Sequence, residues 1–159
     1  MKPNWRDNRS VEGNLKARLP AMALAFFSAG RKAMKPNRTW NQMHKFRLAA
    51  KEFRYTLELF RPVLGAELEA RLEAVQEIQQ FLGDINDAVN VRKLLKPMDG
   101  ADPLREKLAK KLESKRKALI LHWNGQFDAP GELEKWQAYL TAEAGIATQA
   151  VQQKVQART

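Results

Sequence analysis

The apolar residues between Thr39 and Arg61 recur every three or four positions, which is the period of an α-helix. On a helix of about 100° per residue they gather on one face, and a set of basic residues gathers on the opposite face. The apolar face consists of Phe46, Ala49, Ala50, Phe53, Leu57 and Phe60. The basic face consists of His44, Arg47, Lys51 and Arg54. This stretch therefore predicts one amphipathic helix with a core face and a cationic face.

Both ends of this helix are marked in the sequence. Thr39, with Gln42 three positions later, has the form of a capping box, in which a side-chain oxygen accepts a hydrogen bond from an otherwise unpaired backbone N–H. Pro62 disfavours helical backbone at Arg61, so the helix is expected to end there.

Helical spacing continues along the rest of the chain, and no stretch alternates with a period of two. Gly83 and Asp84 have the form of a C-cap followed by an N-cap, so they are expected to separate two helices. Asp102 followed by Pro103 is a further start signal. The additional helices are expected over residues 15–34, 68–82, 85–96, 103–126 and 133–146. The predicted fold class is all-α, an antiparallel helical bundle of five to six helices.

A chain of 159 residues is long enough for one domain with a sizeable core. We expect a basic polar arm over residues 1–14, the bundle over residues 15–147 and a polar tail over residues 148–159. Cysteine is absent, so disulfides and thiolate metal sites are excluded. The chain has no apolar run of about 18 residues and no secretory h-region, which predicts a soluble, cytoplasmic protein.

The net charge of +10 is unevenly distributed. Residues 1–61 contain 14 basic and 4 acidic residues, residues 62–91 contain 1 and 6, and residues 92–159 contain 13 and 8. Such clustered positive charge suggests a polyanionic partner: nucleic acid, an acidic membrane or a phosphate polymer. The sign of the charge does not choose among the three.

Two further basic groups accompany the central helix. Either group could extend an anion site or simply face water, and cations at a helix C-terminus also complement its dipole. The first group, before the central helix, is Arg31, Lys32, Lys35 and Arg38. The second group, on the helix after Pro103, is Lys107, Lys110, Lys111 and Lys117.

The acidic residues of segment 62–91 are interpreted structurally. The helix that carries Glu67, Glu69, Glu73 and Glu77 contains no histidine, so a solvated face is favoured over a metal site. Asp84 and Asp87 suit the start of a helix better than an acid–base pair. We predict no metal site, no cofactor and no catalytic residue.

Two motifs make the sequence similar to a known family. The stretch MHKFRLAAKEFRYTLELF resembles the His-x-x-Arg…Lys-x-x-Arg-Tyr signature of CHAD domains, the conserved-histidine α-helical domains. The segment from Leu82 to Asp87 is similar to the family's Leu-Gly-x-x-x-Asp segment, and Trp123 and Phe127 resemble a later aromatic pair. The signature positions are His44, Arg47, Lys51, Arg54 and Tyr55. Together these similarities span residues 40–127.

The resemblance implies a helical bundle that binds inorganic polyphosphate through basic residues lining a groove, and not an enzyme. It also implies polyphosphate granules as a location and a CYTH-type phosphohydrolase or another polyphosphate-processing enzyme as a partner. The family domain usually has two motif-bearing halves, whereas this chain resembles only the second half. We therefore hypothesise that two copies pair as a symmetric homodimer to complete the groove.

Three other interpretations remain open. A nucleic-acid backbone binder could use the same basic faces, although the phenylalanines of the central helix are expected on its core face, away from any stacking surface. A phosphohydrolase would need clustered carboxylates and a metal, for which the acidic segment 67–87 is the candidate. An adaptor that docks an enzyme could combine with anion binding.

Tyr55 is expected to be packed, with its hydroxyl at the rim of the basic face.

Overall fold

The structure is a computed structural model, and it describes residues 11–36, 38–62 and 64–142. The helices are α1 (Val11–Met34), α2 (Trp40–Leu59), α3 (Leu68–Leu95), α4 (Asp102–Gln126) and a further helical segment at residues 132–142. The described ranges contain no strand. The predicted all-α bundle of five to six helices is therefore confirmed, with five helical segments among the described residues.

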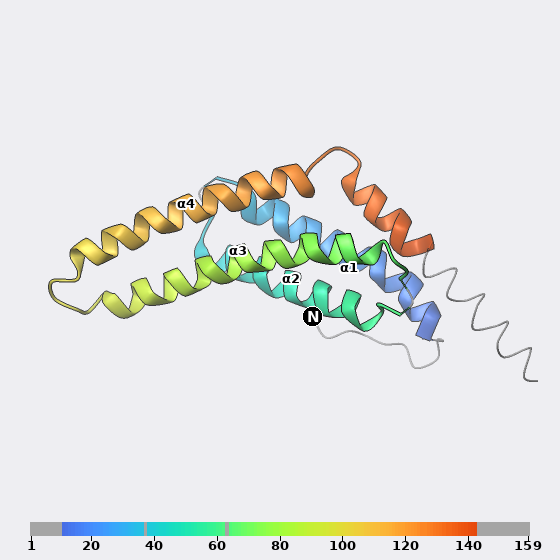
Figure 1. Cartoon of the computed structure of the whole chain (residues 1–159), viewed down its shortest axis with the longest axis horizontal. Coiled ribbons are helices and arrows are strands. Elements are labelled where there is room, and N and C mark those ends of the chain that lie inside the picture. The colour runs from blue at the N-terminus through green and yellow to red at the C-terminus, as the bar shows by residue number, and fades with distance from the viewer. Residues whose placement is uncertain (1–10, 37, 63, 143–159) are drawn as a thin grey trace, which may run out of the picture.

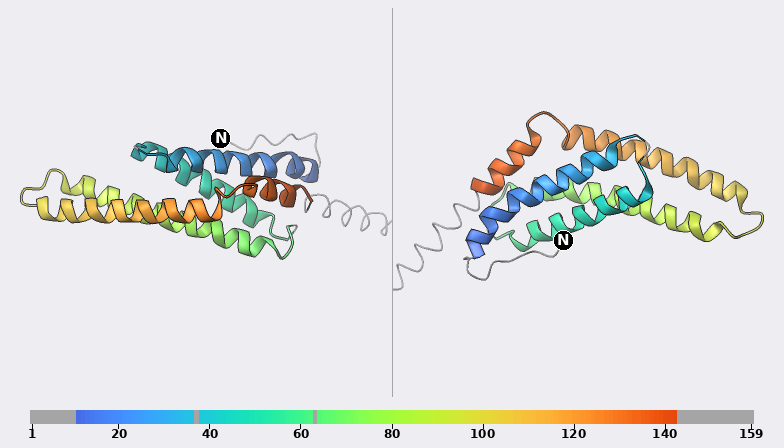
Figure 2. Two further views of the ribbon diagram at one scale, coloured as in Figure 1. Left: turned by 90° about the horizontal axis from the view of Figure 1, so that it is seen from above. Right: turned by 180° about the vertical axis from the view of Figure 1, so that it is seen from behind.

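Each helix packs against the next one along the chain, so neighbouring helices run antiparallel (Figure 1). The most extensive packing is between α3 and α4, which lie side by side along their length. The far end of this α3–α4 pair projects beyond α1 and α2, as the two further views also show (Figure 2). Arg105 closes the projecting end, because its Nη1 donates to the carbonyls of Leu95 and Lys96 at 2.9 Å each.

The core is unusually aromatic. The ring of Phe26 on α1 lies within 5.0–5.7 Å, centroid to centroid, of five other aromatic rings from α1, α2, α4 and the turn after α4. These rings belong to Phe27, Phe46, Phe53, Trp123 and Phe127. Aromatic pairs at such separations contribute beyond the area they bury. This cluster fixes how α2 is rotated and therefore which of its side chains reach the surface.

The ends of α2 agree with the sequence signals. Thr39 is the N-cap, and its backbone N–H donates to Oε1 of Gln42 at 3.0 Å, which is one half of the predicted capping box. The helix ends at Leu59, three residues before Pro62.

The predicted break at Gly83 was wrong, because α3 runs without interruption from Leu68 to Leu95. Asp84 does not cap a helix. Its Oδ1 accepts from Nε2 of Gln80 at 2.9 Å, and its Oδ2 lies 2.5 Å from Nζ of Lys115 on α4. Glycine inside a helix costs only about 1 kcal/mol, and the packing of α3 against α2 and α4 opposes that cost.

Other boundaries differ by a few residues. Helix α1 begins at Val11 instead of Leu15 and includes Pro20 in its interior. Helix α4 begins at Asp102 with Ala101 as its N-cap, and the Asp102 carboxylate pairs with Arg105 instead of capping. Most of the predicted arm, the end of the last predicted helix and the tail lie outside the described residues, so the domain boundaries stay predictions.

Candidate anion-binding site

The four basic residues of the α2 motif lie along the edge of the core. His44, Arg47, Lys51 and Arg54, here called the basic stripe, are all half-buried. The sequence placed them opposite the core, and this was wrong, because they lie on the flank of the helix. The face opposite the core is formed by the exposed residues Asn41, Lys45, Leu48, Glu52, Tyr55 and Leu59. The stripe therefore lies on the flank of α2 between its core face and its exposed face.

The basic stripe has few acidic partners. Arg54, whose side chain is 26% exposed, has its Nε 3.5 Å from Oε1 of Glu58, and this buried Nε makes no hydrogen bond among the described residues. His44, Arg47 and Lys51 form no ion pair within the described part of the chain. Because partly buried cations favour an anion nearby, the stripe is chemically suited to one.

Tyr55 is 50% exposed, so its predicted packing was wrong. The guanidinium carbon of Arg54 lies 4.8 Å from the ring centroid, and Nζ of Lys51 lies 5.7 Å from it. These cation–π contacts hold two stripe residues against one aromatic face.

The basic group before α2 is divided among different roles. Nε of Arg31 pairs with Oδ1 of Asp128 at 2.7 Å, which joins α1 to the turn after α4. Lys32 and Lys35 are exposed. Arg38 is half-buried, and its buried Nε has no hydrogen-bond partner among the described residues.

The lysines predicted as a facing wall are all exposed on α4. Lys110 pairs with Glu106 at 2.7 Å, and Lys117 lies 4.0 Å from Glu113. Lys107 and Lys111 form no ion pair within the described residues. None of these four lysines lines the pocket described next.

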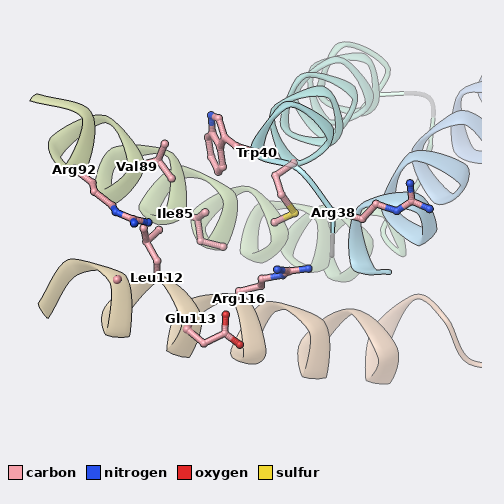
Figure 3. A pocket seen from close by; sticks show the side chains of 10 residues that line it. Arg38, Trp40, Ile85, Val89, Arg92, Leu112, Glu113 and Arg116 are labelled. Atoms are coloured by element: carbon pink, nitrogen blue, oxygen red, sulfur yellow. The ribbon is translucent and has the colours of Figure 1, made fainter. Parts of the chain in front are cut away.

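A pocket of about 210 Å³ lies at the base of the projecting α3–α4 pair, below the connection between α1 and α2 (Figure 3). Arg116 links α4 to the connection between α1 and α2, since its Nη2 donates to the carbonyl of Lys35 at 3.3 Å. The pocket is lined by Arg38, Trp40 and Met43 from the start of α2, by Ile85, Val89 and Arg92 from α3, and by Ala109, Leu112, Glu113 and Arg116 from α4. Three of these residues are cations and one is an anion.

Trp40, Arg92 and Arg116 line this pocket but were not predicted from the sequence as site residues. A signal for Arg92 was present, because Ile85, Val89 and Arg92 are spaced by four and three residues and so share one helix flank. No sequence signal distinguished Arg116 from the more numerous lysines of α4. Its placement depends on how α3 and α4 pair, which no local pattern specifies.

Two acidic residues of α3, Glu77 and Asp84, contact α4. The Lys115 ammonium, hydrogen-bonded to Asp84, holds the pKa of that carboxyl below its ordinary value. Oε2 of Glu77 lies 3.2 Å from Nε2 of His122 on α4. Within the described ranges, no three His, Asp or Glu side chains are grouped so as to hold a metal ion.

The fold and the charge pattern define an all-α bundle with a half-buried row of cations. The model of one family, the CHAD domain, matches residues 3–96, which is more than half of the chain. The chain therefore belongs to the CHAD family, as its motifs predicted. No curated protein and no solved structure matches it. Among the described helices, none is long and apolar enough to cross a membrane.

Proposed function

We propose that this protein binds inorganic polyphosphate along the basic stripe of α2 and acts as a binding module, not as an enzyme. The observation that carries the proposal is the row of half-buried cations, of which Arg54 alone forms an ion pair among the described residues. Membership of the CHAD family supports it, because this domain is associated with polyphosphate-related proteins.

The length of the stripe suits a linear polymer. From His44 to Arg54 the helix rises about 15 Å at 1.5 Å per residue, so its charges can meet successive phosphates of one chain. Arg47 and Arg54 each offer a planar fork to two oxygens, whereas Lys51 contributes a point charge. Such contacts need no metal and no change of covalent bonds. The outer groups Arg31, Lys32, Lys35, Arg38, Lys107, Lys110, Lys111 and Lys117 would extend the attractive field.

Nucleic-acid binding is the second candidate, and the exposed ring of Tyr55 favours it. Tyr55 lies against Arg54 and Lys51, so it could stack one base beside a phosphate contact. The other aromatic residues of the motif helix do not help, because Phe46 and Phe53 are fully buried. A single exposed ring provides little stacking surface, whereas the stripe provides four cations.

A side-by-side titration separates these two candidates. Long-chain polyphosphate and single-stranded RNA are matched in phosphate concentration and titrated at low and at physiological salt. Binding to polyphosphate that persists at physiological salt while RNA binding is lost supports the proposal. Equal loss of both would indicate a nonspecific polyanion binder whose affinity comes from counterion release.

We also propose that two copies pair as a homodimer. Leu48, Tyr55 and Leu59 are exposed on the outer face of α2 and follow one another by seven and four residues, so they form an apolar line beside the stripe. The mass in solution tests this pairing: a monomer at micromolar concentration with polyphosphate binding intact would refute it.

A polyphosphate-processing enzyme, such as a CYTH-type phosphohydrolase, is the proposed further partner, and polyphosphate granules are the proposed location.

A further inference from the structure

Three arginines follow one another along the pocket at the base of the α3–α4 pair. Arg92 comes from α3, Arg116 from α4 and Arg38 from the residue before the N-cap of α2, and we call them the arginine row. Figure 3 shows Arg92 at one end, Arg116 in the middle and Arg38 at the other end. They do not converge on one point. This arrangement matches an extended anion better than a single compact ion.

The row keeps most of its hydrogen-bonding capacity. Arg92 is exposed and makes no hydrogen bond or ion pair with the described residues, and the buried Nε of Arg38 is unpartnered. Arg116 uses Nη2 for the carbonyl of Lys35. Glu113 is the one acidic residue of the lining, and its carboxylate also lies 4.0 Å from Lys117. The lining therefore has a positive excess.

The apolar part of the lining strengthens this charge. Met43, Ile85, Val89 and Leu112 line the same pocket as the arginines and give part of its wall an apolar surface. Charges act over a lower effective dielectric beside such a wall than on an open surface.

The row and the basic stripe are connected through α2. Trp40 lines the pocket, and residues 40, 44, 47, 51 and 54 are spaced by four, three, four and three positions, so they share one flank of the helix. His44 lies about 6 Å along the helix axis from Trp40. A polymer that follows the stripe toward the start of α2 therefore arrives at the pocket.

We infer that the arginine row is a second contact surface for the same polyphosphate chain. The inference rests on the proposed function, since it assigns a further part of the surface to the same ligand. A long chain can occupy the stripe and the row together, and the second contact is then intramolecular and gains from a high effective concentration. Tripolyphosphate, which is shorter than the stripe, can occupy only one of them.

The test compares two neighbouring charge reversals on α3. Arg92→Glu changes a residue that lines the pocket, and Lys93→Glu makes the same charge change at an exposed neighbour that does not line it. Arg92→Glu should lower the ratio of long-chain polyphosphate affinity to tripolyphosphate affinity by at least about tenfold. Lys93→Glu should change that ratio by less than about threefold, through the general field alone. Equal ratios in the two variants would overturn the inference.

A second measurement needs no variant at the row. The indole N–H signal of Trp40, assigned by its loss in Trp40→Phe, reports on the pocket in a proton–nitrogen correlation spectrum. Saturating long-chain polyphosphate should shift this signal. An unshifted signal at saturation would mean that the chain does not reach the pocket.

These experiments also separate the inference from the proposed function. No binding of polyphosphate by the wild type at physiological salt would refute both. If the wild type binds and Arg47→Ala with Arg54→Ala weakens binding, equal behaviour of Arg92→Glu and Lys93→Glu refutes only the arginine row.

Discussion

The six-membered ring of Trp123 on α4 lies against the backbone of Gly30 on α1, in the space where a Cβ atom of residue 30 would be. Both residues are buried, and Trp123 also stacks on Phe127 with ring centroids 5.0 Å apart. Gly30 is therefore needed inside α1 for a close helix contact.

Gly30→Ala should destabilise the protein by about 2–3 kcal/mol, because the new methyl group overlaps a rigid, fully packed ring. The gain in helix propensity, about 1 kcal/mol, works in the opposite direction and is smaller. Thermal or denaturant unfolding measures the net effect. A variant as stable as the wild type would mean that Trp123 can move away from α1 without loss.

Gly83→Ala should have the opposite sign. Gly83 lies inside α3, and a Cβ built on it would meet no atom within 4 Å outside the backbone of its own helix. Alanine removes conformational freedom from the unfolded chain and should stabilise the protein by about 0.4–1 kcal/mol. The same unfolding experiment serves both glycines, so each variant is the control for the other. Destabilisation would indicate that α3 bends or opens at Gly83.

These glycines show how far the sequence could predict the fold. Periodicity identified every helix that the structure describes, and Thr39 and Pro62 located the ends of α2 to within a few residues. The break at Gly83 failed because a local cap signal competed with the packing of α3 against α4. The contact of Asp84 with Lys115 joins residues 31 positions apart, which no short pattern can specify.

The candidate site could likewise be predicted from the sequence only in part. The spacing of His44, Arg47, Lys51 and Arg54 placed these residues on one side of one helix, and the structure has them together, although beside the core and not opposite it. Their half-buried position could not be predicted, since it depends on the rotation of α2 against its neighbours. Arg92 and Arg116 come from two other helices, so only the tertiary packing of α2, α3 and α4 brings them to one pocket.

The ion pair between Asp84 and Lys115 predicts a dependence of stability on pH. Its hydrogen bond holds the pKa of Asp84 below the ordinary value of 3.8, so the carboxylate stabilises the fold above that pH. The stabilisation is lost as the pH falls through the lower pKa of the folded state. Asp84→Asn should therefore reduce stability at neutral pH by less than about 1 kcal/mol, because the pair is only partly buried.

The measurement for Asp84 is the melting temperature as a function of pH. The difference between the wild type and Asp84→Asn should be present at neutral pH and should shrink once the pH falls below 3.8. Asp87→Asn is the matched control, because Asp87 is exposed and its carboxylate contacts only the neighbouring Asn86 at 3.4 Å among the described residues. A difference that persists unchanged in acid would mean that the ion pair is not its source.

Replacing the two arginines of the basic stripe tests the proposed function directly. Arg47→Ala with Arg54→Ala should weaken polyphosphate binding at least about tenfold, since each charge-assisted hydrogen bond contributes roughly 1.5–3 kcal/mol. The control is Lys45→Ala with Lys135→Ala, which removes the same charge from two exposed positions outside the stripe and the pocket. Titrations at physiological salt, with helicity checked by circular dichroism, compare the two. Equal affinity of both folded variants would show that net charge, and not the stripe, holds the polymer.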